Sequence, residues 1–204
     1  MNASAPRPLL GPTDPVPPAS RVLVAGASGA GKTTLAAALA QRWGLTHHEI
    51  DALHHGPNWT PRPTFAQEVH AFAAADGWVT EWQYTAVRPL LASRADLLVW
   101  LDLPRSTVMH QVTRRTLHRR LRRIELWNGN VEGPLRHILT DPEHIIRWAW
   151  RTHGLLADRI ATVRETHPDL PVVRLCSRRE VHTWLHGPAS EGFRDGSVDP
   201  QRRP

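Results

Sequence analysis

The feature that most constrains the fold is the run Gly26-Ala27-Ser28-Gly29-Ala30-Gly31-Lys32-Thr33, followed by Thr34, which fits the phosphate-binding pattern G-x-x-x-x-G-K-[ST]. A short apolar run at 21–25 precedes it, and an Ala- and Leu-rich stretch at 35–43 follows it. We therefore expect a strand, a glycine-rich loop and a helix in that order. Such a loop turns several backbone N–H groups inward at the start of the helix, where a polyphosphate binds.

Within this loop, the sequence predicts that Lys32 reaches the β- and γ-phosphates and that the Thr33 hydroxyl ligates Mg²⁺. Lys32 is the only lysine among the 25 Lys and Arg residues of the chain. A compact ammonium fits inside a tight phosphate loop, whereas a guanidinium fork does not, so the exception has a physical reason. The alternative is an ordinary Gly-rich turn that carries a surface lysine.

Apolar runs of strand length alternate with helical patterns along the chain, which indicates an α/β fold with a parallel sheet of about five strands flanked by helices. The expected strands are 21–25, 46–50, 78–80, 97–101 and 170–176. The expected helices are 35–43, 64–75, 106–126, one from 141 past 159, and 177–186. Thr64 with Gln67 and Ser177 with Glu180 have capping-box spacing.

The domain boundaries follow from composition. Residues 1–20 hold six prolines and no apolar periodicity, so a flexible leader is expected there, and 187–204 reads as a disordered tail. One domain then covers 21–186. The Pro-rich stretch 53–63 is expected to be a loop, and 114–133 a mobile lid that ends in a polar break.

The global properties exclude some classes of protein. There is one cysteine, Cys176, and no apolar run long enough to span a membrane, so a reduced cytoplasmic protein without a membrane partner is expected. A formal net charge of +6 suits a polyanionic partner, either nucleotide phosphates or nucleic acid. The 13 histidines show no spacing typical of a structural zinc site.

Three carboxylates, Asp51, Glu81 and Asp102, each end an expected strand, and the carboxyl ends of parallel strands share one edge of a sheet. We expect Glu81 to act on the Mg²⁺ held by Thr33, with a plain surface residue as the alternative. Asp51 is the candidate for holding or deprotonating an acceptor hydroxyl, unless it only caps the following loop. For Asp102, a helix cap is favoured over catalysis.

Six arginines crowd one expected helix: Arg114, Arg115, Arg119, Arg120, Arg122 and Arg123. Arg115, Arg119 and Arg122 share a face. So many like charges repel each other unless an anion joins them. The anion is a nucleotide triphosphate under a closing lid or a nucleic-acid backbone, and a merely solvated helix face is the remaining alternative.

Beyond the phosphate loop, the chain resembles the small adenylate-kinase-related P-loop proteins called topology modulation proteins, from about Arg21 to Trp184. The most specific part of the resemblance is Leu126-Trp127-Asn128-Gly129-Asn130. The other matching segments are Asp51-Ala52-Leu53, Trp59-Thr60-Pro61, Tyr84 with Arg88, Arg94-Ala95-Asp96, Trp100-Leu101-Asp102-Leu103-Pro104, Arg114-Arg115-Thr116-Leu117, Glu125, Glu132 and Trp148-Ala149-Trp150-Arg151-Thr152-His153.

The resemblance implies a P-loop NTPase fold of the nucleotide-kinase type, with ATP, Mg²⁺ and an arginine-rich lid. It implies that Asp51, Trp59, Tyr84 and Arg88 bind the acceptor. The remaining implied roles belong to the lid, where Arg115 and Arg119 hold the transferring phosphates. The family usually has Asp-Gly-Asn-Tyr where this chain has Glu81-Trp82-Gln83-Tyr84, a change that bears on the metal and on the acceptor.

Two hypotheses of function follow. The first is an ATP-dependent kinase acting on a small hydroxyl- or phosphate-bearing acceptor, with Lys32, Asp51, Arg115 and Arg119 in catalytic roles. The second is an ATP-binding switch or slow ATPase associated with nucleic acid, in which the arginine helix contacts the phosphate backbone. Steep salt dependence of binding would distinguish the second from the first.

Overall fold

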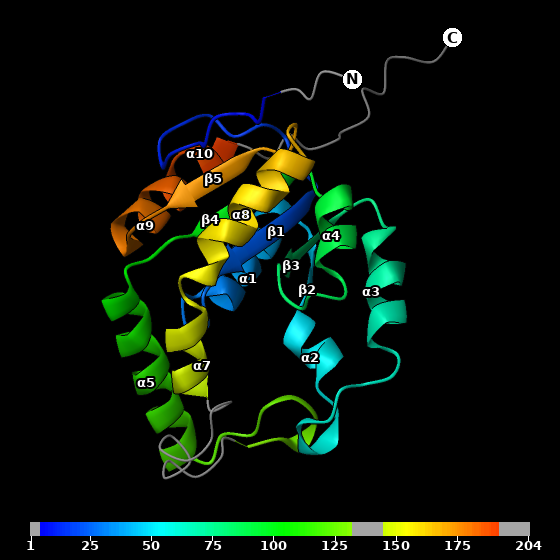
Figure 1. Cartoon of the computed structure of the whole chain (residues 1–204), viewed down its shortest axis with the longest axis vertical. Coiled ribbons are helices and arrows are strands. Elements are labelled where there is room, and N and C mark those ends of the chain that lie inside the picture. The colour runs from blue at the N-terminus through cyan, green and yellow to red at the C-terminus, as the bar shows by residue number, and fades with distance from the viewer. Residues whose placement is uncertain (1–4, 132–144, 192–204) are drawn as a thin grey trace.

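The computed structural model describes residues 5–131 and 145–191. Five strands form one parallel sheet in the order β2-β3-β1-β4-β5 (Figure 1). The strands are β1 Arg21–Gly26, β2 Thr46–His48, β3 Trp78–Glu81, β4 Leu97–Leu101 and β5 Val172–Leu175. This arrangement confirms the expected α/β class and the five-stranded parallel sheet.

Helices surround the sheet, as Figure 1 shows. The longer ones are α1 Lys32–Trp43, α3 Phe65–Ala73, α5 Arg105–Leu121, α7 Ile145–Thr152, α8 Leu155–Thr166 and α9 Arg178–His186. The shorter ones are α2 Ile50–His54, α4 Arg88–Arg94, α10 Pro188–Glu191 and the single 3-10 turns η1 Pro57–Trp59 and η2 Trp127–Gly129.

Two apolar cores pack against the two faces of the sheet. Alternate residues of β1 point to opposite faces, so Leu23 and Ala25 join the core under α3, α4 and α8, while Val22 and Val24 join the core under α1 and α9. All five residues of β4 are buried. A central strand that is buried on both faces reads as a continuous apolar run, which is why β1 and β4 could be predicted from the sequence.

The central position of β1 places the phosphate loop in the middle of one sheet edge. Gly26 pairs in register with Leu101 of β4, and Val24 pairs with Glu81 of β3. Glu81 therefore lies on the neighbouring strand, at the same edge as the glycine-rich loop.

Several local expectations were wrong. The second strand ends at His48, and Asp51 lies in α2 instead of at a strand end. Thr64 precedes α3, but its side chain makes no capping hydrogen bond. The arginine helix ends at Leu121, five residues early, and the C-terminal helical stretch breaks into α7 and α8. The start expected at Asp141 lies outside the described residues, as do Glu132 and Gly133 at the end of the expected lid.

The Ser177 capping box is confirmed: its hydroxyl accepts a hydrogen bond from the Glu180 N–H at 3.1 Å, and the Glu180 carboxylate accepts one from the Cys176 N–H at 2.8 Å. The sequence pattern missed α4, a seven-residue helix.

The terminal segments differ from the expected flexible leader and tail where they are described. Leu10 forms a parallel bridge with Val173 of β5, and the backbone of Leu10 exchanges hydrogen bonds with Val172 and Arg174. At the other end, the Ala189 carbonyl of α10 accepts a hydrogen bond from the Trp43 indole at 2.7 Å. Unpaired edges of a sheet readily take such partners, and proline-rich composition does not prevent it. Residues 1–4 and 192–204 lie outside the described part.

Among the described residues, no helix is both long and apolar enough to cross a membrane.

Candidate active site

The phosphate loop has the backbone geometry that its glycines permit. Gly29 and Gly31 have φ values of 89° and 97°, a left-handed region that residues with a side chain rarely adopt. A Cβ on Gly29 would lie 2.8 Å from the Cβ of Val112, so the loop packs directly against α5. Gly31 precedes α1, and no side chain caps the first N–H groups of that helix. These N–H groups are thus placed for an anion.

Lys32 lies within the loop it was expected to serve. Its side chain is buried, with 8% exposed, and Nζ donates a hydrogen bond to the Ala27 carbonyl at 3.2 Å. Burial lowers the pKa of Lys32, the charges of Asp51 and Glu81 oppose that shift, and the charge of Arg115 adds to it. Asp51, Glu81 and Arg115 therefore lie close enough to Lys32 for their charges to act on it.

Glu81 is almost fully buried, with 1% exposed, which rules out the surface alternative. Its Oε1 lies 3.3 Å from Nε2 of His47, and its Oε2 accepts the Ile50 N–H at 3.2 Å. Burial by itself would raise the pKa of Glu81. The hydrogen bonds from His47, from the Ile50 N–H and from the Thr33 hydroxyl outweigh it and hold the pKa below the usual range.

An ionised carboxylate beside the Thr33 hydroxyl is a hard oxygen pair of the kind that Mg²⁺ prefers. In the described part of the chain, no cluster of three or more His, Cys, Asp or Glu side chains is placed to hold a metal ion. These two observations agree, because Mg²⁺ in phosphate sites is bound by one or two protein groups and completes its shell with phosphate oxygens and water. The residues present thus fit Mg²⁺ delivered with a nucleotide.

Asp51 is half-buried, and one of its oxygens is held in place. Oδ1 accepts hydrogen bonds from the Tyr84 hydroxyl at 2.6 Å and from the Gln83 amide at 3.2 Å. Among residues 5–131 and 145–191, Oδ2 has no hydrogen-bond partner. That oxygen can accept a proton or a hydrogen bond from a bound molecule.

Tyr84 links Asp51 to His55 in the Pro-rich stretch 53–63. Burial, the charge of Asp51 and the hydrogen bond to it raise the pKa of Tyr84, so the phenol keeps its proton and donates it to Asp51. The Tyr84 oxygen also lies 3.1 Å from Nε2 of His55. Since the phenol has one proton to donate, His55 is the donor in this second contact. The Tyr84 ring also stacks on His54 with ring centres 3.9 Å apart.

Trp59 contacts the segment that follows the arginine helix. Its backbone N–H donates to Oδ1 of Asn130 at 2.9 Å, and Nδ2 of Asn130 donates to the Gly56 carbonyl at 2.9 Å and to the Trp127 carbonyl at 2.7 Å. Asn128 adds a hydrogen bond to the His55 carbonyl. We call these contacts between 55–61 and 125–131 the asparagine clasp.

Arg88 is placed differently from the expectation. Its guanidinium donates to the Thr85 hydroxyl at 2.7 Å, lies over the Trp82 ring with 5.6 Å to the ring centre, and faces the groove between α4 and α8. No contact joins it to Asp51 in the described residues. The acceptor-binding role of Arg88 stays a prediction.

Asp102 has a structural contact. Its Oδ2 accepts hydrogen bonds from Nε and Nη2 of Arg174 at 2.8 and 2.5 Å, which ties β4 to β5. The expected helix cap does not form, because α5 begins at Arg105 after Pro104, without a side-chain cap.

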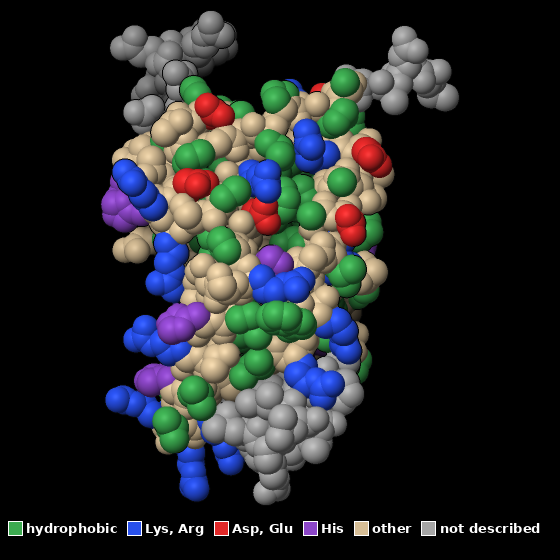
Figure 2. Space-filling view, turned by 60° about the vertical axis from the view of Figure 1, so that its left-hand side comes forward, with side chains coloured by type: hydrophobic (Ala, Val, Ile, Leu, Met, Phe, Trp, Pro, Cys, Tyr) green, Lys and Arg blue, Asp and Glu red, His purple; other side chains and the backbone are tan. Residues whose placement is uncertain are grey.

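The arginine helix divides by exposure. Arg115 and Arg119 are half-buried, whereas Arg114, Arg122 and Arg123 are exposed. Figure 2 shows Lys and Arg side chains over both halves of the face in view, whereas the acidic side chains lie in its upper half, so the lower half carries positive charge alone. The charge of Arg115, one of the proposed lid arginines, acts on Lys32.

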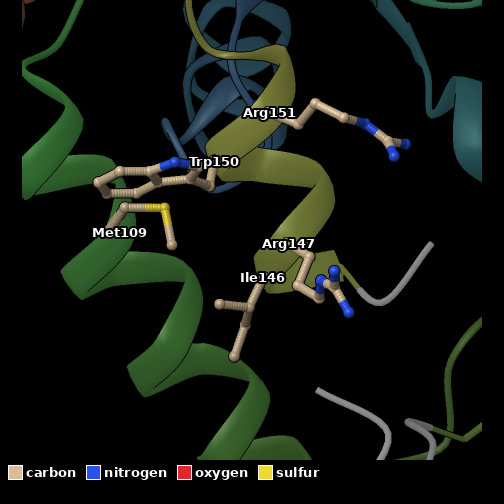
Figure 3. Close-up of a pocket in the computed structure, with 5 residues that line it drawn as sticks. All are labelled: Met109, Ile146, Arg147, Trp150 and Arg151. Carbon is tan, nitrogen blue, oxygen red and sulfur yellow. The ribbon is translucent and has the colours of Figure 1, made fainter. Parts of the chain in front are cut away.

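A cavity of about 390 Å³ lies between α5 and α7. Figure 3 shows Trp150 beside Met109 and Ile146 turned toward α5, while Arg147 and Arg151 extend on the other side of α7. The Arg105 guanidinium lies over the Trp150 ring at 4.8 Å. This packing joins α7 to the arginine helix.

The sequence patterns assigned no role to three polar residues of the site. These are His47, which contacts Glu81, His55, which contacts Tyr84, and Gln83, which contacts Asp51. No periodicity distinguishes such polar neighbours, because their contacts form between segments far apart in the chain. Asn130 had a signal, since it belongs to the most specific part of the family resemblance.

No family model and no curated protein sequence matches the chain. Solved structures to which the chain is similar include a sugar kinase from Janibacter sp. HTCC2649, at 21% sequence identity over 87% of this chain and 100% of that chain, with a TM-score of 0.44. A shikimate kinase from Acinetobacter baumannii shares 14% identity over 84% of this chain and 87% of its own, with a TM-score of 0.47. A gluconokinase from Sinorhizobium meliloti 1021 shares 22% sequence identity over 72% of this chain and 99% of its own, with a TM-score of 0.38.

Proposed function

We propose that the chain is an ATP-dependent kinase that moves the γ-phosphoryl group of ATP to a small hydroxyl- or phosphate-bearing acceptor. The observation that supports this most is the meeting of a buried lysine in a phosphate loop with Asp51, Glu81 and Arg115 at one edge of a parallel sheet. Phosphoryl transfer needs that combination: cations around the phosphates, a carboxylate for the metal and a carboxylate for the acceptor.

In this proposal the phosphate side is served by the loop and the lid. The N–H groups of 26–34 hold the phosphate oxygens, and Lys32 neutralises charge on the β- and γ-phosphates. Thr33 and Glu81 hold Mg²⁺, which supplies further charge neutralisation when it is bound. Arg115 and Arg119 stabilise the transferring group from the lid side.

The acceptor side is served by Asp51. Its Oδ2 receives the proton of the acceptor hydroxyl while the hydroxyl oxygen forms a bond to the γ-phosphorus. The bond between the γ-phosphorus and the oxygen that bridges it to the β-phosphate breaks, and ADP leaves. The hydrogen bonds from Tyr84 and Gln83 fix the carboxylate during this step.

We further propose that Trp59, in the segment 55–61 of the asparagine clasp, lines the space that the acceptor occupies. Proteins with this chemistry act in the compartment that holds ATP, in keeping with the cytoplasmic prediction.

The proposal is tested by ADP release from ATP and Mg²⁺, with and without a panel of nucleosides, nucleoside monophosphates, sugar acids and hydroxylated metabolites. We expect at least one class of acceptor to raise ADP release well above the basal rate. Basal release that no acceptor changes would point instead to the ATP-binding switch.

A further inference from the structure

A second cavity, of about 370 Å³, lies between α4 and α8. It is lined by Trp82, Thr85, Arg88, Pro89, Ala92, Arg159, Thr162, Val163, Thr166 and His167. Lys32, Thr33, Asp51 and Glu81 are absent from this lining, so the cavity is separate from the proposed nucleotide and metal site. Its volume is in the range of small-molecule sites, roughly 300–1,000 Å³.

The cavity has an apolar side formed around Trp82. The Trp82 side chain is part of the sheet core and is 7% exposed, and Nε1 donates a hydrogen bond to the Arg88 carbonyl at 3.2 Å. This bond fixes the orientation of the indole. Pro89, Ala92 and Val163 add further apolar surface. The flat apolar ring of a ligand would lose its contact with water on this surface and could stack on the Trp82 indole.

The cavity also holds two positive charges. The guanidinium of Arg88 lies 5.6 Å from the Trp82 ring centre, and Arg159 approaches from α8. Burial lowers the pKa of Arg88, and the charge of Arg159 lowers it further. No Asp or Glu is among the described lining residues. Two like charges in a partly apolar cavity repel each other, and a bound anion would relieve that repulsion.

The threonine hydroxyls of α8 are already committed as donors. Thr162 bonds to the Asp158 carbonyl at 3.0 Å, and Thr166 bonds to the Thr162 carbonyl at 2.9 Å. These two hydroxyls are therefore not free to donate to an anion, and Arg88 and Arg159 supply the positive charge that would hold one.

We propose that this cavity is a second binding site for a small molecule that joins an apolar ring to one anionic group, with the ring against Trp82 and the anion between Arg88 and Arg159. The inference does not depend on the proposed kinase activity, because none of the residues that it uses serves ATP or Mg²⁺. Arg88 is the one residue with a predicted acceptor role, and the test therefore changes Arg159 instead. The anion is a carboxylate or a phosphate, which bind arginine through the same charge-assisted hydrogen bonds.

The test uses the full chain and the dye 8-anilinonaphthalene-1-sulfonate, which has apolar rings and one sulfonate, with its neutral analogue N-phenyl-1-naphthylamine for comparison. Excess ADP and Mg²⁺ fill the nucleotide site. We expect Arg159→Gln to weaken binding of the anionic dye about 10-fold or more and to leave the neutral analogue unchanged. Thr162→Trp, which fills the cavity from an exposed position, should weaken both dyes.

Arg94→Gln is the matched control, because Arg94 is exposed on α4 and does not line the cavity. Dye affinity that neither Arg159→Gln nor Thr162→Trp changes would overturn the proposal. A dye affinity that is much lower in excess ADP and Mg²⁺ than in the absence of nucleotide would also overturn it, because the dye would then bind in the nucleotide site. Displacement by 2-naphthoate or by 2-naphthyl phosphate would support it and show whether a carboxylate or a phosphate is preferred. Failure of both competitors would contradict it.

Discussion

At the scale of single residues, Glu81 combines two properties that seldom coincide. It is almost fully removed from solvent, yet three hydrogen-bond donors keep it ionised. An ionised group that is fixed in place costs no rearrangement when a metal arrives, so Glu81 is suited to orient Mg²⁺ next to Thr33.

Glu81→Gln is therefore expected to raise the Mg²⁺ concentration needed for half-maximal ADP release by on the order of 10-fold, the usual loss when a group that orients a metal is changed. Titration of Mg²⁺ at fixed ATP measures this. Glu68→Gln is the control, because Glu68 lies on α3, forms an ion pair with Arg62 and lies outside the proposed metal site. An unchanged Mg²⁺ requirement would remove Glu81 from the metal site.

The lowered pKa of Glu81 also leads to a prediction of how the free energy of unfolding depends on pH. Its pKa in the folded chain lies below the ordinary 4.5, so the unfolded chain binds more protons between those two values. The contribution of Glu81 to stability is thus fully present above pH 4.5 and is lost as the pH falls through the folded-state pKa. Denaturant unfolding from neutral pH downward should show a steeper loss for the natural chain than for Glu81→Gln. Parallel curves would contradict this.

At the scale of elements, the phosphate loop and the arginine helix are packed together at Gly29. The missing side chain there allows Val112 of α5 to approach, and the φ of 89° also disfavours any residue with a Cβ. Both constraints act on the same position, so loop geometry and helix position are coupled.

We predict that Gly29→Ala lowers the free energy of unfolding by about 1–3 kcal/mol and weakens ATP binding, because the new methyl group must displace the loop or the helix. Thermal unfolding and nucleotide titration measure the two effects. Gly11→Ala, where a Cβ meets no atom closer than 3.5 Å, should leave both unchanged. Equal behaviour of the two variants would disprove the coupling.

The asparagine clasp joins two segments 70 residues apart in sequence, 55–61 in the Pro-rich stretch and 125–131 at the end of the expected lid. Removing the Asn130 amide breaks three hydrogen bonds, each contributing about 1 kcal/mol. Asn130→Ala should therefore speed trypsin cleavage among the arginines of 114–123 by on the order of 10-fold under native conditions. Gln67→Ala, an exposed amide change on α3, serves as the control. Cleavage at the same rate in both would show that the clasp does not restrain this segment.

At the scale of the whole molecule, the sheet and the phosphate loop could be predicted because their signals are local. Apolar runs such as 97–101 and the glycine pattern need no tertiary information. The sequence also predicted that Asp51 and Glu81 lie near the carboxyl edge of the sheet, where their charges act on Lys32, and their roles stay predictions. Other features depend on packing between segments that are distant in the sequence, which no local pattern encodes. They are the position of Asp51 in α2, the ion pair of Asp102 with Arg174 and the placement of the Arg88 guanidinium over the Trp82 ring.

Transfer of the γ-phosphoryl group of ATP to an acceptor is tested most directly by following that group. ATP labelled at the γ-phosphate is supplied with Mg²⁺ and the acceptor panel, to the natural chain and to Lys32→Ala. We predict label on an acceptor with the natural chain and none with Lys32→Ala, because the buried ammonium neutralises the phosphates. Label that appears only as inorganic phosphate, or transfer that persists in Lys32→Ala, would contradict the account.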